Sequence, residues 1–377
     1  MTVVGQRTFK SCHASAPDWQ SAAQTCLAEL RPIPADANLG FIYLTDALAE
    51  DMETLLDYLR AETGIDNWIG SVGMGICGTG MEYYDRVALS IMVASFPTDS
   101  FRVFDPLISD TDSFEKAHGP WLQAHDPYFG VVHGDPRNSQ IPSLVEQLSH
   151  TMGSGFLVGG LSSSRGRYSQ IANSVTEGGL SGVLFSPEVS VSTRLSQGCS
   201  PLGPRYQVTA AEENLVIELD GRPALDVLKE SVGEVMSRDL RKVAGYIFVG
   251  IPIEGADTGD YLVRNLMGLD PTSGIIAVGD HLPVGSSMMF CRRDGRSAVD
   301  DLRRMLSELK ANLKSPPKGG IYCTCIGRGI NLFGANSEEL TMIQNELGPF
   351  PLTGFYANGE ISHNRLYTYT GVLSLFL

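Results

Sequence analysis

Residues 321–376 decide the fold class, because strand-like and helix-like segments alternate along them. They begin with I321-Y-C-T-C-I-G-R-G-I-N-L-F-G334 and end with L352-T-G-F-Y-A-N-G-E-I361 and T370-G-V-L-S-L-F376. The apolar runs in these three stretches predict strands. The segment between the first two predicts a helix, since its apolar residues repeat at the spacing of one helical face: Leu340, Ile343 and Leu347.

The same alternation continues through the rest of the chain, except that several strand-like runs follow one another directly. Helical stripes are predicted within residues 18–31, 46–63, 142–153, 223–230 and 297–314. Adjacent strands favour antiparallel pairing, so we predict an α+β protein. It would have two α/β domains with mixed or largely antiparallel sheets flanked by helices, for example as helix/sheet/sheet/helix layers. The Asp220-Gly221 turn marks the predicted domain boundary.

One polar segment, residues 97–140, contains three of the seven histidines. We predict one strand there, Ser100–Phe104, followed by an exposed loop. The loop would carry His118, His125 and His133. Histidines in such a loop are either solvated side chains or ligands for a metal or haem iron.

Composition restricts the classes of partner. The chain has 377 residues, enough for two domains, with 43% hydrophobic and 19% charged residues. Its net charge of −15 argues against nucleic acid and against anionic membrane surfaces. The sequence contains no apolar run long enough to span a membrane and no signal peptide, so we predict a cytoplasmic protein without membrane insertion.

The cysteines and glycines give no catalytic or metal motif. Seven cysteines without an export signal predict reduced thiols, and Cys323-Thr-Cys325 lacks the partners of a zinc site. Gly73–Gly78 matches G-x-G-x-x-G, but a strand rather than a helix follows it, so we do not read it as a dinucleotide fingerprint. P-loop, H-E-x-x-H and G-x-S-x-G motifs are absent from the sequence. We therefore predict no metal site and no catalytic residue.

Three stretches share one order: an apolar run, a Gly-containing turn, a polar stretch and a second apolar run. They begin at Ile69, Leu157 and Leu352. The period is irregular, which is not typical of a solenoid. An old duplication of a sheet unit and chance among 41 glycines are both open.

The two Gly-rich turns near the C-terminus carry one cation and one anion, Arg328 and Glu360. A guanidinium suits a carboxylate and a carboxylate suits an ammonium, so together they suit a small zwitterionic ligand. In the alternative reading Arg328 and Glu360 pair with each other and only fix the two loops. The full set of predicted ligand-binding residues is Arg328, Glu360, Asn358, Gly354, Phe355, Cys325 and His363. Cys325 is also a candidate nucleophile, because nearby Arg328 would lower its pKa, although a buried strand cysteine is the simpler reading.

Five sequence blocks resemble the FIST family of sensory modules. They are V132-H-G-D-P-R-N138, L157-V-G-G-L-S-S-S164, the long block from Gly198 to Leu228, C325-I-G-R-G329 and G354-F-Y-A-N-G-E-I361. Their order and spacing resemble those of the family over nearly the whole chain. The resemblance implies a FIST N-terminal domain at residues 35–219 and a FIST C-terminal domain at residues 220–377.

The resemblance also implies a function. Such modules are cytoplasmic sensory domains that bind a small ligand, with amino acids or related metabolites as the usual proposal. They are associated with histidine kinases and cyclic-dinucleotide enzymes, and some relatives bind haem and sense nitric oxide. We therefore expect a stand-alone sensory module without a required cofactor, acting on its output protein in trans. A haem-based gas sensor and an enzyme with Cys325 as nucleophile are the alternatives.

Overall fold

The computed structural model describes residues 8–153, 155–237, 245–253 and 261–377. Helices combine with mixed and antiparallel sheets, which confirms the predicted α+β class. Contacts divide the chain into two compact units. The larger contains Met1–Ser196 and Asp301–Leu377, and the smaller contains Gln197–Asp300. Among the described residues, no helix is long and apolar enough to cross a membrane.

The larger unit consists of three repeats with the same order of elements. The first contains β1 (Phe9–Ser15), α1 (Trp19–Leu30), β2 (Leu39–Thr45), the 3-10 turn η1 (Asp46–Asp51), α2 (Met52–Thr63), β3 (Asn67–Gly73), β4 (Gly75–Gly78), β5 (Met81–Tyr84) and β6 (Ala88–Ala94). The second contains β7 (Phe101–Leu107), α3 (Asp112–His125), β8 (Phe129–Gly134), α4 (Ile141–Thr151), β9 (Phe156–Leu161), β10 (Gln170–Ala172), β11 (Val175–Thr176) and β12 (Leu180–Phe185). The third contains β13 (Val191–Gln197), α6 (Gly295–Asn312), β22 (Gly319–Cys325), the 3-10 turn η3 (Gly329–Asn331), α7 (Glu338–Leu347), β23 (Leu352–Ala357), β24 (Glu360–His363), β25 (Arg365–Tyr367) and β26 (Thr370–Phe376).

Each repeat completes its sheet with a hairpin from another repeat. The three sheets have the orders β1-β6-β2-β3-β10-β11, β7-β12-β8-β9-β24-β25 and β13-β26-β22-β23-β4-β5. The second repeat thus gives its hairpin to the first, the third to the second, and the first to the third. This cyclic exchange ties residues from all three repeats into one unit.

Three glycines occupy the same place in the three sheets. At Gly70, Gly159 and Gly354, an added Cβ would lie 1.8, 1.8 and 1.9 Å from the carbonyl oxygen of the neighbouring parallel strand. Only glycine fits such a close backbone approach. These positions supply a common register for comparing the repeats. The repeated order of elements favours the duplication reading of the three similar stretches.

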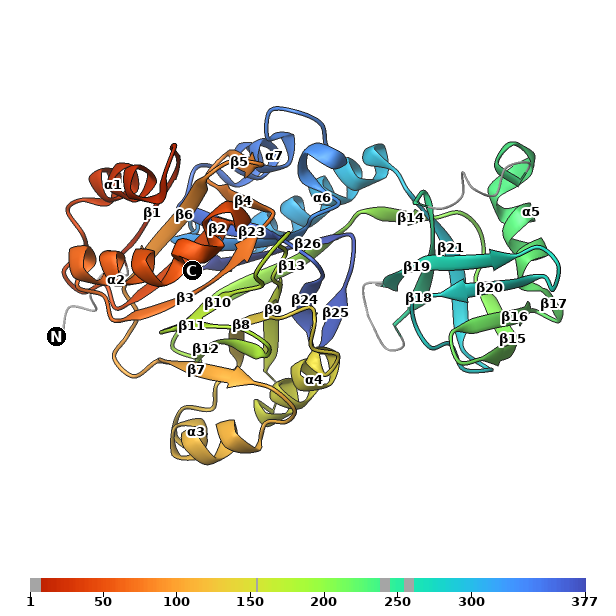
Figure 1. Ribbon diagram of the computed structural model, residues 1–377, viewed down its shortest axis with the longest axis horizontal. Coiled ribbons are helices and arrows are strands. Elements are labelled where there is room, and N and C mark those ends of the chain that lie inside the picture. The colour runs from red at the N-terminus through yellow and green to blue at the C-terminus, as the bar shows by residue number, and fades with distance from the viewer. Residues whose placement is uncertain (1–7, 154, 238–244, 254–260) are drawn as a thin grey trace. The chain divides into compact units, whose positions relative to one another are not determined.

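One face of each sheet packs into a shared central core, and the other face packs under helices. The central core includes Phe41, Phe129, Phe185, Phe355 and Phe376, drawn from all three repeats. Separate apolar clusters lie beneath α1 and α2, beneath α3 and α4, and beneath α6 and α7. Figure 1 shows these helix pairs at three corners of the larger unit. The helical stripes predicted within residues 18–31, 46–63, 142–153 and 297–314 contribute to these outer clusters, whereas the stripe within 223–230 lies in the smaller unit.

The smaller unit folds around its own apolar cluster. Its strands are β14 (Cys199–Pro201), β15 (Tyr206–Glu212), β16 (Leu215–Leu219), β17 (Arg222–Pro223), β18 (Ile247–Pro252), β19 (Tyr261–Asp270), β20 (Ile275–Val278) and β21 (Ser287–Arg293). They form one antiparallel sheet, with β21 also pairing β18 and with α5 (Ala224–Ser237) packed on β16 and β20. The unit lies in sequence between β13 and α6. In the first two repeats, the corresponding strand and helix are joined by short loops.

The prediction for residues 97–140 is partly wrong. The predicted strand Ser100–Phe104 is confirmed except for its first residue, because β7 begins at Phe101, but the predicted exposed loop is wrong. His118 and His125 lie in α3, and His133 is a fully buried residue of β8. The apolar run Phe129–Val132 is short and interrupted by Gly130, which is why the pattern does not predict its strand.

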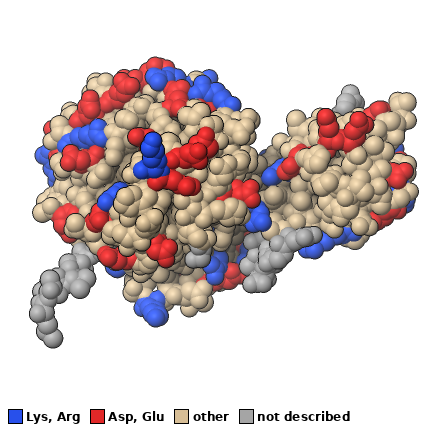
Figure 2. All heavy atoms as spheres, turned by 90° about the horizontal axis from the view of Figure 1, so that it is seen from below, with Lys and Arg blue, Asp and Glu red and all other residues tan. Residues whose placement is uncertain are grey.

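Charges of both signs lie close together on the surface of the larger unit. Figure 2 shows acidic and basic side chains interspersed on the visible face of the larger unit. Many exposed arginines there pair with carboxylates, for example Arg165 with Asp46 and Asp85 at 2.8 and 2.7 Å. Paired cations leave little net positive field for phosphate groups.

Candidate functional site

The polar residues of interest lie where the parallel strands β2, β8 and β22 end. The common register makes Thr45, Asp135 and Cys325 equivalent positions. Each faces the turn that enters the last strand of its own repeat, which is β6, β12 or β26. Thr45 Oγ1 donates to Arg86 O at 2.7 Å, and Asp135 Oδ2 accepts the Gly178 N–H at 2.8 Å. The Cys325 sulfur faces the backbone N–H of Tyr369 in the same way.

Arg328 is completely buried, and its guanidinium forms an ion pair with Glu339 of α7. Arg328 Nε and Nη2 lie 2.8 and 2.7 Å from Glu339 Oε1. The remaining donors face Ser196, at 3.4 Å from its carbonyl oxygen and 3.3 Å from its hydroxyl. Burial alone would lower the pKa of Arg328, but the negative charge of Glu339, the nearby Tyr322 and the hydrogen bonds to both residues together outweigh burial and raise it. The guanidinium is therefore held inside the protein.

Glu339 is equally well satisfied. Its Oε1 also accepts the Tyr322 hydroxyl at 2.6 Å, and its Oε2 accepts the Gly329 N–H at 2.9 Å. The pair thus anchors the C325-I-G-R-G turn to the first turn of α7. The alternative in which Arg328 pairs with Glu360 is wrong, because Glu339 is the partner.

Glu360 is the other fully buried charged residue of the predicted set. Its Oε2 accepts two hydrogen bonds from Thr370, from the N–H at 3.0 Å and from the hydroxyl at 2.8 Å. Its Oε1 has no hydrogen-bond partner among the described residues. Burial raises the pKa of Glu360 to about 8, although the Thr370 donors and the Arg328 charge oppose the shift. The Cys325 thiol beside the carboxyl group also opposes the shift, but a thiol is only a weak donor.

The repeats explain why one oxygen of Glu360 is unpaired. Glu360 pairs with Gly160 of β9, and Gln170 pairs with Ser71 of β3. Gly160 and Ser71 each follow the glycine of the common register, so Glu360 and Gln170 are equivalent. Gln170 is fully satisfied, because its Oε1 accepts the Ser181 hydroxyl at 2.8 Å and its Nε2 donates to Gly179 O at 3.2 Å. In the third repeat, a valine stands where Ser181 stands in the second.

The remaining predicted residues do not all gather around these two charges. Gly354 and Phe355 lie in the middle of β23, with Gly354 against Tyr322 O and Phe355 stacked on Tyr43 in the core at 5.1 Å. Asn358 is exposed, and its N–H donates to Leu161 O at 3.0 Å. His363 ends β24, with φ +59° and its ring 5.5 Å from Phe156.

Cys325 lies beside Glu360 in a dry environment. Its side chain is 6% exposed, and burial raises the pKa of the thiol far above its usual range, with the Glu360 charge adding to the shift. The nearby Arg328 opposes the shift but is overcome. The thiol is therefore protonated at neutral pH, which disfavours nucleophilic chemistry. All seven cysteines are free and buried.

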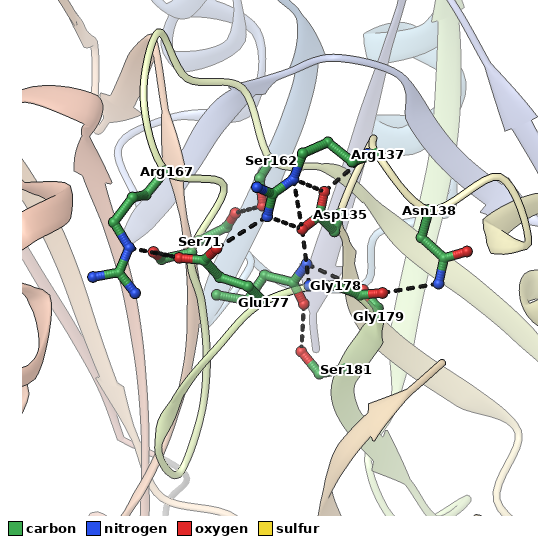
Figure 3. Close-up of polar contacts among 12 residues, drawn as sticks. Ser71, Asp135, Arg137, Asn138, Ser162, Arg167, Glu177, Gly178, Gly179 and Ser181 are labelled. Atoms are coloured by element: carbon green, nitrogen blue, oxygen red, sulfur yellow. Dashed lines mark hydrogen bonds and ion pairs between the residues drawn. The ribbon is translucent and has the colours of Figure 1, made fainter. Parts of the chain in front are cut away.

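One polar network is absent from the predicted site, although the quoted block V132–N138 supplies two of its residues, Asp135 and Arg137. Arg137 donates to Asp135 at 2.6 Å and to Glu177 at 3.0 Å, and Glu177 accepts from Arg167 at 2.7 Å. Figure 3 shows Arg137 between the two carboxylates, with Arg167 on the far side of Glu177. Burial alone would raise the pKa of Asp135, but bonds from Arg137 and Gly178 lower it.

Beside this network, Ser71 and Ser162 join the first two repeats through a 2.8 Å hydroxyl contact. The H-G-D-P-R-N motif in V132–N138 was the available signal, because Asp and Arg two residues apart after a strand often form a local charged turn. The described hydrogen bonds of the network join residues of the second repeat to one another, so we interpret it as a structural connection within that repeat.

The histidines occupy three different environments. His133 Nε2 lies 3.0 Å from the Tyr43 hydroxyl, and burial lowers the pKa of His133 to about 3. His125 Nε2 lies 2.9 Å from Asp99, and the His118 ring packs 5.0 Å from Phe114. Within the described residues, no group of three or more His, Cys, Asp or Glu side chains is placed to hold a metal ion.

A shallow groove of about 220 Å³ lies between α1 and α2. Its lining residues are Gln24, Leu27, Ala28, Arg31, Tyr58 and Glu62. The two charged residues pair with each other at 2.6 Å. None of the predicted site residues lines it.

Comparison with known proteins assigns the family. The FIST N domain matches residues 38–222, and the FIST C domain matches residues 224–363. Two uncharacterised proteins of Mycobacterium tuberculosis, from strains CDC 1551 and H37Rv, are each 31% identical over 378 residues, covering 97% of this chain and 98% of the relative. An uncharacterised protein of Mycobacterium bovis is 37% identical over 192 residues, covering 48% of this chain and 50% of its own.

A solved structure of a cyanuic acid hydrolase from A. caulinodans aligns with 99% of both chains, but with a TM-score of 0.31 and 10% identity. That similarity is too weak to support a conclusion about fold or activity. The two family matches cover nearly the whole chain, and the chain belongs to the FIST family.

Proposed function

We propose that this chain is a sensory module that binds a small ligand through Glu360 and acts on a separate output protein. FIST domains are in general sensory domains of signal transduction, and both FIST domains match this chain. We further propose that the module works in the cytoplasm, and that a histidine kinase or a cyclic-dinucleotide enzyme receives its signal.

The observation that carries the proposal is the Oε1 atom of Glu360, which accepts no hydrogen bond from the part of the chain that the structure describes. A buried carboxylate oxygen without a donor costs about 1–3 kcal/mol or more, so such an atom in a folded protein calls for an explanation. A positively charged N–H group is the strongest donor for it. We therefore propose a ligand with an ammonium group, such as an amino acid or a related metabolite.

The other predicted residues receive different roles. The donors of Arg328 already bind Glu339 and Ser196, so we assign Arg328 to positioning the turn that carries Cys325. Cys325 and Thr370 surround the carboxyl group of Glu360. Because the thiol of Cys325 is protonated, we propose a binding role rather than a catalytic one. Rapid alkylation of Cys325 by iodoacetamide at neutral pH would contradict this assignment.

A thermal-shift screen tests the proposal. Amines and amino acids are compared with their N-acetylated analogues at pH 8, where more of Glu360 is ionised. A ligand at 100 times its Kd adds about 2.7 kcal/mol of stability, a shift of several degrees. The gain should be lost in Glu360→Gln and kept in Glu346→Gln, a partly exposed residue that pairs only with Lys310 among its described contacts. If no amine stabilises the parent, or if Glu360→Gln responds equally, the proposed site is wrong.

A further inference from the structure

We propose that Val372 determines ligand binding in the third repeat, because it leaves Glu360 Oε1 open for an external N–H donor. This inference rests on the proposed function and specifies how the site arises. In the second repeat, a hydroxyl from the same chain occupies the equivalent place. The proposal therefore concerns Val372 and the hydrogen-bond donor that its side chain does not have.

The register of the sheets shows that Val372 and Ser181 are equivalent. Ser181 of β12 lies opposite His133 of β8, and Val372 of β26 lies opposite Cys323 of β22. The carbonyl of Val132 faces Gly159 as the carbonyl of Tyr322 faces Gly354, so Val132 and Tyr322 are equivalent. His133 and Cys323 directly follow these two residues and are therefore equivalent as well.

The hydrogen bonds agree with this register. Gln170 bonds Ser181 of β12 and Gly179, which lies two residues earlier, directly before that strand. Glu360 bonds Thr370, which lies two residues before Val372. Residues two apart on a strand share a face, so Val372 stands on the face that carries the Thr370 hydroxyl. Strands β10 and β12 are in contact, as are β24 and β26.

The three repeats have three different residues at the position of Glu360. In the first repeat Ile76, which pairs with Phe355, is apolar and needs no partner. In the second, Gln170 is polar, and its Oε1 accepts a hydrogen bond from the Ser181 hydroxyl. In the third, Glu360 is polar and only its Oε2 accepts hydrogen bonds from the described residues, because the side chain of Val372 has no donor. Two differences, Glu360 in place of Gln170 and Val372 in place of Ser181, thus distinguish the proposed binding position from the structural one.

The chemistry of the open position favours a primary ammonium group. A donor placed where the Ser181 hydroxyl lies would approach Oε1 at about the usual hydrogen-bond length of 2.8 Å. A carboxylate surrounded by apolar groups favours a cation over a neutral donor, since the pair neutralises its charge. Burial keeps most of Glu360 protonated at neutral pH, so binding of an ammonium ion would release a proton.

Binding at this position would also require movement. Glu360 and Val372 are 0% and 1% exposed, whereas several residues of the segment 364–369 are partly exposed. A ligand can reach the carboxylate only if part of the structure around it opens. A ligand that prefers one conformation shifts the population toward it, which is what a sensory domain needs.

Matched substitutions at residue 372 test the inference. Val372→Thr keeps the shape of the side chain and adds a hydroxyl that can donate to Glu360 Oε1. Val372→Ala removes two methyl groups without adding a donor. Methylammonium chloride is the probe, and tetramethylammonium chloride, which has the same charge but no N–H, is the control. The melting temperature is measured at pH 8 for the parent and both variants.

We expect methylammonium but not tetramethylammonium to raise the melting temperature of the parent and of Val372→Ala. Val372→Thr should melt higher than the parent without ligand and should lose at least tenfold in methylammonium affinity. Val372→Ser, with the same hydroxyl and less bulk, should also lose the response. Ser181→Val should be destabilised but should respond like the parent.

Two results would overturn the inference, and they are distinguishable. Equal responses of the parent and Val372→Thr would show that Val372 has no role, while the Glu360 site would stand. No response of the parent to methylammonium would contradict both the role of Val372 and an ammonium site at Glu360.

Discussion

At the scale of single residues, Glu360 shows how burial raises the pKa of a carboxyl group. Thr370 satisfies one oxygen, while the other oxygen and the dry surroundings disfavour the charged form. A carboxyl whose native pKa lies above its unfolded value of 4.5 favours folding most at low pH. Its contribution is lost as the pH rises from 4.5 through about 8.

Glu360→Gln should therefore gain stability relative to the parent as the pH rises. The gain between pH 4.5 and 8 should reach the order of 4 kcal/mol, since a difference of one between the native and unfolded pKa values corresponds to about 1.4 kcal/mol. Urea denaturation of both proteins across this range measures it. Glu82 also titrates there, because burial raises its pKa to about 7, so Glu82→Gln is the necessary comparison. A constant difference between parent and Glu360→Gln would contradict the prediction.

The sequence allows some of these residues to be predicted and not others. Glu360 stands out as an anion on a Gly-rich turn, and it is the residue with the unpaired oxygen. Its state depends on Thr370 and Val372, and nothing in the local pattern marks either as a neighbour. The burial of His133 is hidden for a similar reason, because its bond to Tyr43 joins strands 90 residues apart. Long-range contacts of this kind leave no periodic signal in one sequence.

At the scale of elements, the turn after β22 is held by a buried ion pair. The apolar stripe of α7 predicts the helix, but an acidic residue at its start looks like a solvated cap. Only the three-dimensional contact with Arg328 shows that Glu339 points inward. Adjacent Glu338 is exposed and provides a natural control.

Glu339→Gln should destabilise the protein by about 3–5 kcal/mol, because it leaves the Arg328 charge buried without a counterion. Glu338→Gln should change stability by less than about 0.5 kcal/mol, as expected for an exposed residue. Urea denaturation at neutral pH measures both. Similar losses in the two variants would show that Arg328 and Glu339 do not depend on each other.

The close approach of β22 and β23 can be tested at its glycine. An alanine methyl group at Gly354 would overlap Tyr322 O, so Gly354→Ala should cost about 3 kcal/mol or more, or prevent folding. The control is Gly268→Ala in β19, where the nearest atom to an added Cβ is 3.7 Å away. That substitution should be neutral or stabilise by up to about 1 kcal/mol. Equal melting temperatures for the two variants would contradict the close approach.

At the scale of the whole molecule, the larger unit consists of three repeats, of which the sequence shows only three short similar stretches. The similar stretches at Ile69, Leu157 and Leu352 are the strands β3, β9 and β23 with their following turns. Their spacing is irregular because the third repeat contains the smaller unit between its first strand and first helix. The cyclic exchange of hairpins is not predictable from the sequence, since any of three sheets could accept each hairpin.

Removal of the smaller unit tests this organisation. In the first two repeats, three and four residues join the strand and helix that correspond to β13 and α6. Replacing residues 198–294 by a linker of four Gly and Ser residues should therefore leave the larger unit folded, because its apolar clusters contain no residue from the deleted segment. Residues 197–300 expressed alone should also fold around their own cluster. Cooperative thermal unfolding followed by circular dichroism checks both products. If the shortened chain unfolds without a transition while the isolated insert folds, the smaller unit is required to complete the third repeat, and the reading of it as an insertion is wrong.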